Sequence, residues 1–142
     1  MAIKIITMAT INEDYVSFET AKLLKEKGFD AYGDGSFDSS IKVWMEYSPF
    51  GKIRDISTAT PSVKGFPAPT LQMAMKWLRI KHSLSVEVYR TACGYVGCIV
   101  AIPSGTDIKF LEEDGDDLPS GTYTKWEYAC EAGIKYCLEN LI

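Results

Sequence analysis

The stretch LSVEVYRTACGYVGCIVAI, residues 84–102, carries the strongest β-strand pattern in the chain. Residues 86–89 alternate between apolar and polar side chains, as expected of a strand with one buried face. Residues 98–102 form a nearly continuous apolar run, which is typical of a strand covered on both faces. Gly94 and Gly97 allow a hairpin turn or a bulge between the two halves. The stretch therefore predicts a central antiparallel hairpin, against which helices must pack.

The helix expected just before this hairpin, residues 70–82 (TLQMAMKWLRIKH), is apolar on two sides. Pro69 or Thr70 provides its start. On a helical wheel, the first apolar face comprises Leu71, Ala74, Met75 and Leu78. The second comprises Met73, Trp77 and Ile80. A helix apolar on two sides is buried between layers or lies at an interface, so Met73, Trp77 and Ile80 are a possible interaction surface.

Two further helices are predicted, over residues 125–140 and 17–27. Thr124 and Glu127 have the T-x-x-E spacing of a capping box at the start of the later helix. One face of that helix is apolar and contains Trp126, Ala129, Cys130, Gly133, Ile134, Cys137 and Leu141. Ser17 is a suitable N-cap for the earlier helix, and Gly28 is suited to end it.

The remaining chain predicts strands and loops. Strands are expected at 2–8, at 41–46 paired with 52–57 through a turn at 48–51, and at 107–112. Residues 59–69 contain three prolines and a glycine and are expected to form a loop. Together these elements predict a single α+β domain, residues 1–142. Its antiparallel sheet would have about four to six strands, with three packed helices.

Length and composition limit the class of protein. The 142 residues suit one domain, and 46% apolar with 24% charged residues is ordinary for a soluble globular chain. The net charge of −4 is uneven, because residues 1–90 carry 12 basic and 10 acidic side chains, whereas residues 91–142 carry 3 and 9. No secretory signal and no apolar run of the roughly 20 residues needed to span a membrane is apparent. We therefore expect a cytoplasmic protein with reduced thiols and no membrane partner.

The sequence predicts no catalytic residue, cofactor or metal site. Cys130 and Cys137 are two helical turns apart, about 10 Å along the helix axis, which is too far for one zinc ion. Cys93 and Cys98 lack the tight spacing of a zinc knuckle, and neither a G-x-G-x-x-G motif nor a P-loop is present. The acidic segment 112–121 fails the calcium-loop pattern. An enzyme that pairs the only histidine, His82, with Cys93 or Cys98 is the one catalytic hypothesis left open.

A basic and aromatic cluster gives a second functional hypothesis. Lys76, Arg79, Lys81 and Arg90 lie close in sequence to Trp77 and Tyr89. Cations combined with aromatic rings are typical of surfaces that bind the backbone and stack the bases of nucleic acids. The acidic overall balance makes nucleic acid the less favoured partner.

Three stretches taken together resemble a known group of proteins: VSFETAKLLKEKGFD (16–30), APTLQMAMKWLRIKH (68–82) and YACEAGIKYCLENLI (128–142). In this order they resemble a family of small uncharacterised proteins encoded by phages, prophages and mobile elements of gut bacteria. The resemblance extends over roughly the whole chain and is weakest over 91–126. It implies a cytoplasmic accessory protein of phage or mobile-element origin and supplies no catalytic or ligand residues.

These observations predict a non-enzymatic interaction module, with an unknown protein or a second copy of the chain as its partner. The alternative is a nucleic-acid-binding accessory protein that uses the basic helix around residues 76–90.

Overall fold

The computed structural model of the chain describes residues 11, 14–29, 41–45, 53–55, 65–112 and 121–142. Within these residues the elements follow the order α1 (Phe18–Glu26), β1 (Ile41–Met45), β2 (Ile53–Asp55), β3 (Gly65–Pro69), α2 (Leu71–His82), β4 (Leu84–Thr91), β5 (Gly94–Ala101), β6 (Asp107–Phe110), α3 (Trp126–Tyr136) and the short π-helix η2 (Cys137–Leu141). The predicted strand at 2–8 and the turn at 48–51 lie outside the described residues.

The α+β class and the three predicted helices are confirmed in the described part of the chain, but the sheet arrangement differs from the prediction. The strands form two antiparallel sheets, with orders β2-β1-β3 and β4-β5-β6. Each sheet has three strands, fewer than the four to six expected of one sheet. Part of the difference lies in residues 65–69, which were expected to be a loop. They form β3, whose backbone pairs with β1 from Ile41↔Pro69 to Met45↔Gly65.

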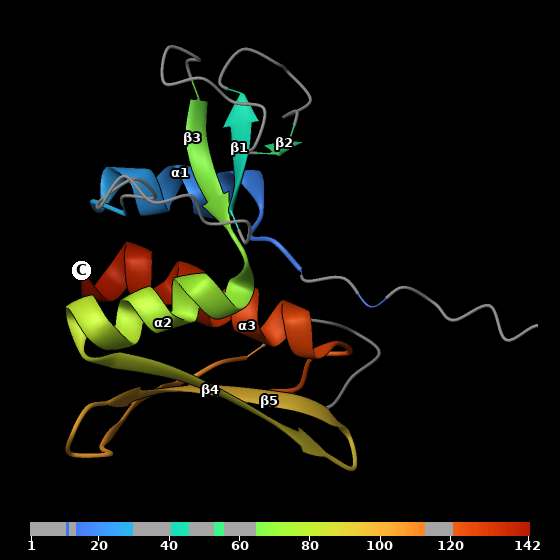
Figure 1. Cartoon of the computed structure of the whole chain (residues 1–142). Helices are drawn as coiled ribbons and strands as arrows, with labels where there is room; N and C mark the ends of the chain where they lie inside the picture. The colour runs from blue at the N-terminus through green and yellow to red at the C-terminus, as the bar shows by residue number, and fades with distance from the viewer. Residues whose placement is uncertain (1–10, 12–13, 30–40, 46–52, 56–64, 113–120) are drawn as a thin grey trace, which may run out of the picture.

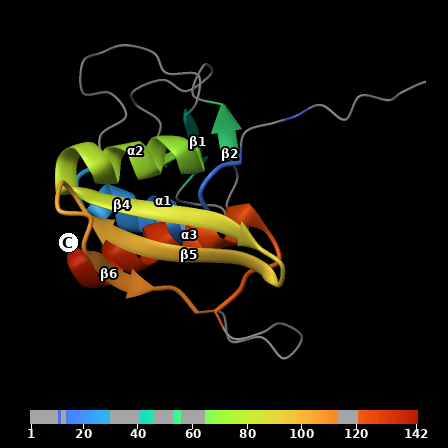
Figure 2. The same ribbon diagram turned by 90° about the horizontal axis from the view of Figure 1, so that it is seen from below.

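The helices gather on one side of the sheet β4-β5-β6. Figure 1 shows α2 and α3 above this sheet and α1 beyond them, on the side away from β4 and β5. In agreement, α3 contacts both β4 and β5, α2 contacts β4 and α3, and α1 contacts α3 and β3. Figure 2, viewed from below, shows β4 and β5 in front of α1 and α3, with α2 alongside β4. The sheet thus has a helix-covered inner face and an outer face.

Local capping explains where two helices begin and end. The amide of Thr20 donates to Ser17 Oγ at 3.3 Å, and that of Met73 donates to Thr70 Oγ1 at 3.2 Å. These bonds satisfy amides that have no partner within a helix. Gly28 follows α1 with φ of +95°, a conformation that suits glycine, so its predicted role is confirmed.

The predicted capping box at the last helix is wrong. The N-cap of α3 is Lys125 rather than Thr124, and no side chain caps the helix. The helix begins at Trp126, one position later than the T-x-x-E spacing requires, so Thr124 lies outside the cap position. The predicted apolar face is nevertheless confirmed at its centre, where Ala129, Cys130, Ile134 and Cys137 are fully buried.

The core is built around the crossing of α3 over the sheet. Gly133 allows this close approach, because a Cβ atom there would lie 2.4 Å from Val86 Cγ1. Val86 pairs with Ile99 across β4 and β5, and Ile99 is completely buried. Leu78 of α2 and Leu24 of α1 complete the same core, also with no exposed surface. The inner face is therefore packed as closely as a domain interior.

Candidate interaction surface

Strand register assigns every side chain of the main sheet to one of its two faces. The pair Val86↔Ile99 points toward the helices, and so does Gly97, where an added Cβ would meet Leu111 and Ala129. Successive residues of a strand alternate between faces, so the neighbours of these residues point the opposite way. The outward positions, which we call the outer face, are Ser85, Glu87, Tyr89, Val96, Cys98, Val100, Asp107 and Phe110.

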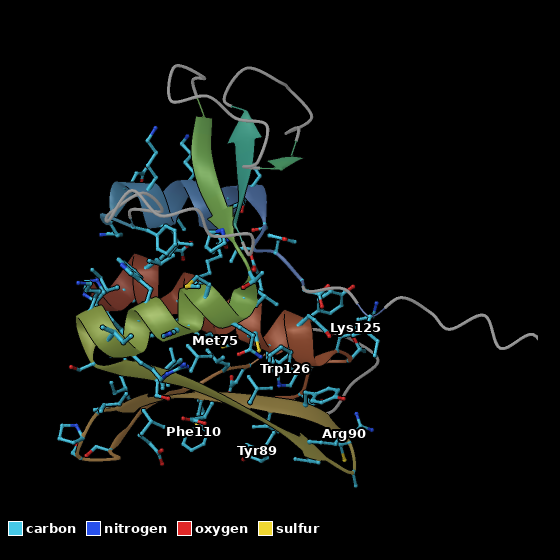
Figure 3. All side chains as sticks on the ribbon, viewed as in Figure 1. Met75, Tyr89, Arg90, Phe110, Lys125 and Trp126 are labelled. Carbon is cyan, nitrogen blue, oxygen red and sulfur yellow. The ribbon has the colours of Figure 1, made fainter. Side chains whose placement is uncertain are left out.

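The outer face is apolar along its middle strand, β5. Its rows run across the sheet as Ser85–Val100–Asp107, Glu87–Cys98–Phe110 and Tyr89–Val96. Tyr89 and Phe110 are 52% and 53% exposed, and Ile108, beside a register shift in β6, is 41% exposed. Figure 3 shows Tyr89 and Phe110 on the side of the sheet opposite to Met75 of α2. No helix or strand of the described residues packs on this face.

The apolar run at 98–102 was expected to be covered on both faces, and this prediction is wrong within the described chain. Ile99 is buried under the helices, whereas Val100 and Ile102 retain exposed surface and Ile102 is 38% exposed. Both faces of β5 are therefore apolar in this run, but the described helices cover only one of them.

The charged groups on the outer face are both acidic. Glu87 lies on the edge strand β4 and accepts a hydrogen bond from Ser85 Oγ, and Asp107 lies on the opposite edge strand β6. Cys98 lies between them, and its thiol pKa is raised mainly by burial. The negative charges of Asp107 and Glu87 add to this effect, because they disfavour a nearby thiolate. Both carboxylates therefore act electrostatically on the centre of this face.

The nearest cations lie on the inner side of the same strands. Arg90 pairs with Tyr95, and its guanidinium carbon is 5.1 Å from the centre of that ring. Lys109 pairs with the inward-facing Ile99, and its Nζ is 5.8 Å from the ring centre of Tyr136 in α3. Along each edge strand, the cation faces inward and its aromatic neighbour faces outward.

The predicted surface formed by Met73, Trp77 and Ile80 is divided in the structure. Trp77 makes edge-on ring contacts with Phe29 at 5.7 Å and with His82 at 4.6 Å between ring centres. Met73 and Trp77 are half-buried and pack against the core, whereas Ile80 is 64% exposed. Ile80 is therefore the part of this surface that a partner would reach most readily.

The predicted nucleic-acid contacts are likewise separated. Lys76, Arg79 and Lys81 are exposed along α2, which ends where β4 begins. Arg90 is near the other end of β4, about 20 Å further at roughly 3.3 Å per residue. The structure therefore places three of the four cations on α2 and Arg90 beside Tyr95.

The cysteines and His82 do not form a catalytic pair. Cys93 is exposed at the turn between β4 and β5, one strand length from His82, and Cys98 points to the outer face while His82 packs on Trp77. Burial raises the pKa of Cys130 and of Cys137 to about 12, and Glu127 and Glu131 add to the effect at Cys130. Within the described residues no group of three or more His, Cys, Asp or Glu side chains is placed to hold a metal ion.

An open depression of about 490 Å³ lies at the start of α3, lined by Asp14, Tyr95 and residues 124–128. Figure 3 shows Lys125 and Trp126 at this end of the helix. Lys125 Nζ lies 5.4 Å from the ring centre of Tyr128, and the carboxylates of Asp14 and Glu127 also line the depression. Its mixed charges favour no particular class of ligand.

Among the described residues, no helix is long and apolar enough to cross a membrane. Family models, curated proteins and solved structures contain no match to this chain. The sequence placed Tyr89 in the basic and aromatic cluster but did not identify Phe110 or the face that the two residues share, although the apolar run at 98–102 beside alternating strands was a signal for that face.

Proposed function

We propose that this chain is a small cytoplasmic interaction module that binds another protein through the outer face of the sheet β4-β5-β6. The observation that carries the proposal is the pair of half-exposed aromatic side chains, Tyr89 and Phe110, on an apolar face that the described helices leave open. Contiguous apolar surface of this kind is typical of interaction sites. Aromatic side chains of this type are also the common energetic anchors of protein interfaces.

The packing of the helices supports the choice of this face over α2. Trp77, the largest side chain of the surface first predicted, is already engaged with Phe29 and His82. Ile80 remains as an isolated exposed side chain, and single exposed apolar residues are common on proteins that bind nothing there. The outer face has several apolar positions in adjacent rows, which is what an interface needs.

Phage or mobile-element origin remains part of the proposal, since three stretches of the sequence resemble such proteins. The cytoplasmic location is supported by the four cysteines, all of which are free. The apolar sheet face gives such an accessory protein a surface on which to bind a partner.

Site-specific photo-crosslinking tests the proposal. A crosslinking amino acid at position 110 is expected to capture partner proteins in bacterial cells that carry the gene, whereas one at Ile80 is not. Tyr89→Thr, made together with the crosslinker at 110, should reduce the captured product by about tenfold, as for an interface anchor. Equal capture from positions 80 and 110, or capture unaffected by Tyr89→Thr, would contradict an interaction through the outer face.

Nucleic-acid binding through α2 is the second candidate, favoured by the exposed cations Lys76, Arg79 and Lys81 on one helix. Electrostatic binding to nucleic acid is strongest at low salt. Single- and double-stranded DNA and RNA should therefore be titrated at about 50 mM salt, against wild type and Lys76→Glu/Arg79→Glu. Equal affinity of the two proteins, or no measurable affinity, would exclude this role for α2.

A further inference from the structure

We infer that the partner segment bound at the outer face is cationic: a stretch of another protein in which Lys or Arg side chains flank apolar ones. This inference rests on the proposed function and adds the chemistry of the partner. Three observations about the outer face support it. The carboxylates lie on the edge strands, no described cation lies over its aromatic rings, and none of its eight positions is Lys or Arg.

The carboxylates frame the apolar strip. Glu87 and Asp107 lie on the two edge strands, which are separated by β5 and therefore about 10 Å apart at roughly 4.8 Å per strand. Cys98 and Val100 of β5 lie between them, and Val96 continues the apolar strip beside Tyr89. A segment laid on this strip would bury its apolar side chains on β5 and hold cations near an acid at either edge.

The aromatic rings extend the same preference. Arg90 and Lys109, which neighbour Tyr89 and Phe110 in sequence, face the opposite side and lie over Tyr95 and Tyr136. Among the described cations, none is found over the ring of Tyr89 or Phe110. A guanidinium or ammonium group from a partner would gain a cation–π contact at these rings, in addition to an ion pair with a carboxylate.

The same charges disfavour the other occupants. A second copy seated face to face would bring the same two carboxylates without supplying a cation, because an isologous contact uses the same patch on both subunits. A nucleic acid would place its phosphates beside Glu87 and Asp107, which repel them. A cationic protein segment is the occupant that satisfies both the apolar strip and its acidic edges.

Short synthetic peptides provide the test. A fluorescently labelled peptide of alternating Leu and Arg is titrated with the full chain, alongside matched Leu/Gln and Leu/Glu peptides. The Leu/Arg peptide is expected to bind most tightly. The double variant Glu87→Gln/Asp107→Asn should weaken binding of the Leu/Arg peptide by about fivefold to tenfold, which is the effect expected from losing two partly exposed ion pairs. Circular dichroism verifies that each variant is folded.

A matched control separates the outer face from general attraction to an acidic protein. Glu26→Gln/Glu139→Gln also removes two negative charges, but from exposed positions in α1 and η2. Its affinity for the Leu/Arg peptide should stay within about twofold of wild type, as expected for surface charges remote from the site. Equal weakening by the two double variants would overturn the inference, since the attraction would then depend on net charge alone.

Tyr89→Thr/Phe110→Thr distinguishes failure of this inference from failure of the proposed function. If this variant weakens binding of the Leu/Gln peptide while Glu87→Gln/Asp107→Asn leaves Leu/Arg binding unchanged, the outer face is an interaction site without a preference for cations. If Tyr89→Thr/Phe110→Thr leaves all three peptides unaffected, the proposed function fails and this inference with it. A dimer in light scattering that the same variant dissolves would assign the face to a second copy and overturn the cationic partner.

Discussion

On the inner face of the sheet β4-β5-β6, Val86 and Ile99 lie under α3, and Ile99 has no exposed surface. On the outer face, Tyr89 and Phe110 are half-exposed, and no described element packs on them. The two faces belong to the same strands, and both are apolar along the middle strand β5. Burial therefore separates a side chain that stabilises the fold from one that is available to a partner, and hydrophobicity alone does not.

Ile99→Ala should give the largest effect. The substitution removes apolar volume from a fully buried site, so it is expected to lower the free energy of unfolding by about 2–5 kcal/mol. Urea denaturation followed by circular dichroism measures it. The matched variant Val100→Ala, one residue further along β5 and on the outer face, should cost much less. A similar loss at both positions would show that the outer face is packed as tightly as the inner one.

Gly133→Ala tests the close approach of α3 to β4. The new Cβ would lie 2.4 Å from Val86 Cγ1, and overpacking of this kind typically costs about 1–3 kcal/mol. Combining it with Val86→Ala makes room for the methyl group, so the double variant should lose less stability than the two single changes together. If Gly133→Ala instead stabilised the protein by about 1 kcal/mol, as expected from helix propensity alone, the helix would not press on the sheet.

The sequence predicted the inner face far better than the outer one, and the reason is physical. Periodicity identifies which residues of a helix or strand share a face, and it located Ala129, Cys130, Ile134 and Cys137 in the core. It does not state whether another element covers a given face. The run at 98–102 was therefore interpreted as doubly covered, and it stayed open whether Trp77 is buried or lies at an interface, because Phe29, which packs on it, is distant in sequence.

The same limit applies to the candidate site. Tyr89 and Phe110 are 21 residues apart in the chain, and only the pairing of β4, β5 and β6 places them on one face. The capping box also failed, because the N-cap of α3 is Lys125 and the helix begins at Trp126, one position after the start that the T-x-x-E spacing predicts. Ser17 and Thr70 do cap their helices, since each side-chain oxygen accepts a hydrogen bond from the amide three residues later.

Raising the pH should destabilise the protein through the thiols on the helix side of the sheet. The pKa of Cys130 and of Cys137 is raised to about 12 in the fold, against 9.0 for an unperturbed thiol. Their contribution to stability is therefore complete below pH 9 and declines as the pH rises from about 9 toward 12, because the unfolded chain loses these protons first. The urea midpoint measured between pH 7 and 11 should fall.

Cys130→Ala provides the control for that titration. It removes one buried thiol, so the midpoint should fall less steeply above pH 9 than in wild type, whatever its value at pH 7. Cys93→Ala, at the exposed turn, should leave the steepness unchanged. An identical pH dependence in all three proteins would assign the alkaline loss to other groups.

Tyr89→Thr and Phe110→Thr should have the smallest effect on stability, at most about 1 kcal/mol each, because both residues are about half exposed and Thr is a good strand residue. Urea denaturation checks this value, and binding of an apolar dye to the folded protein should decrease at the same time. An inner-face substitution such as Ile99→Ala is expected to lower stability, whereas an outer-face substitution removes a binding surface and leaves the fold nearly as stable. A loss of 3 kcal/mol or more at Phe110, comparable with the cost of emptying a core site, would mean that Phe110 is a core residue and that the outer face is not free to bind a partner.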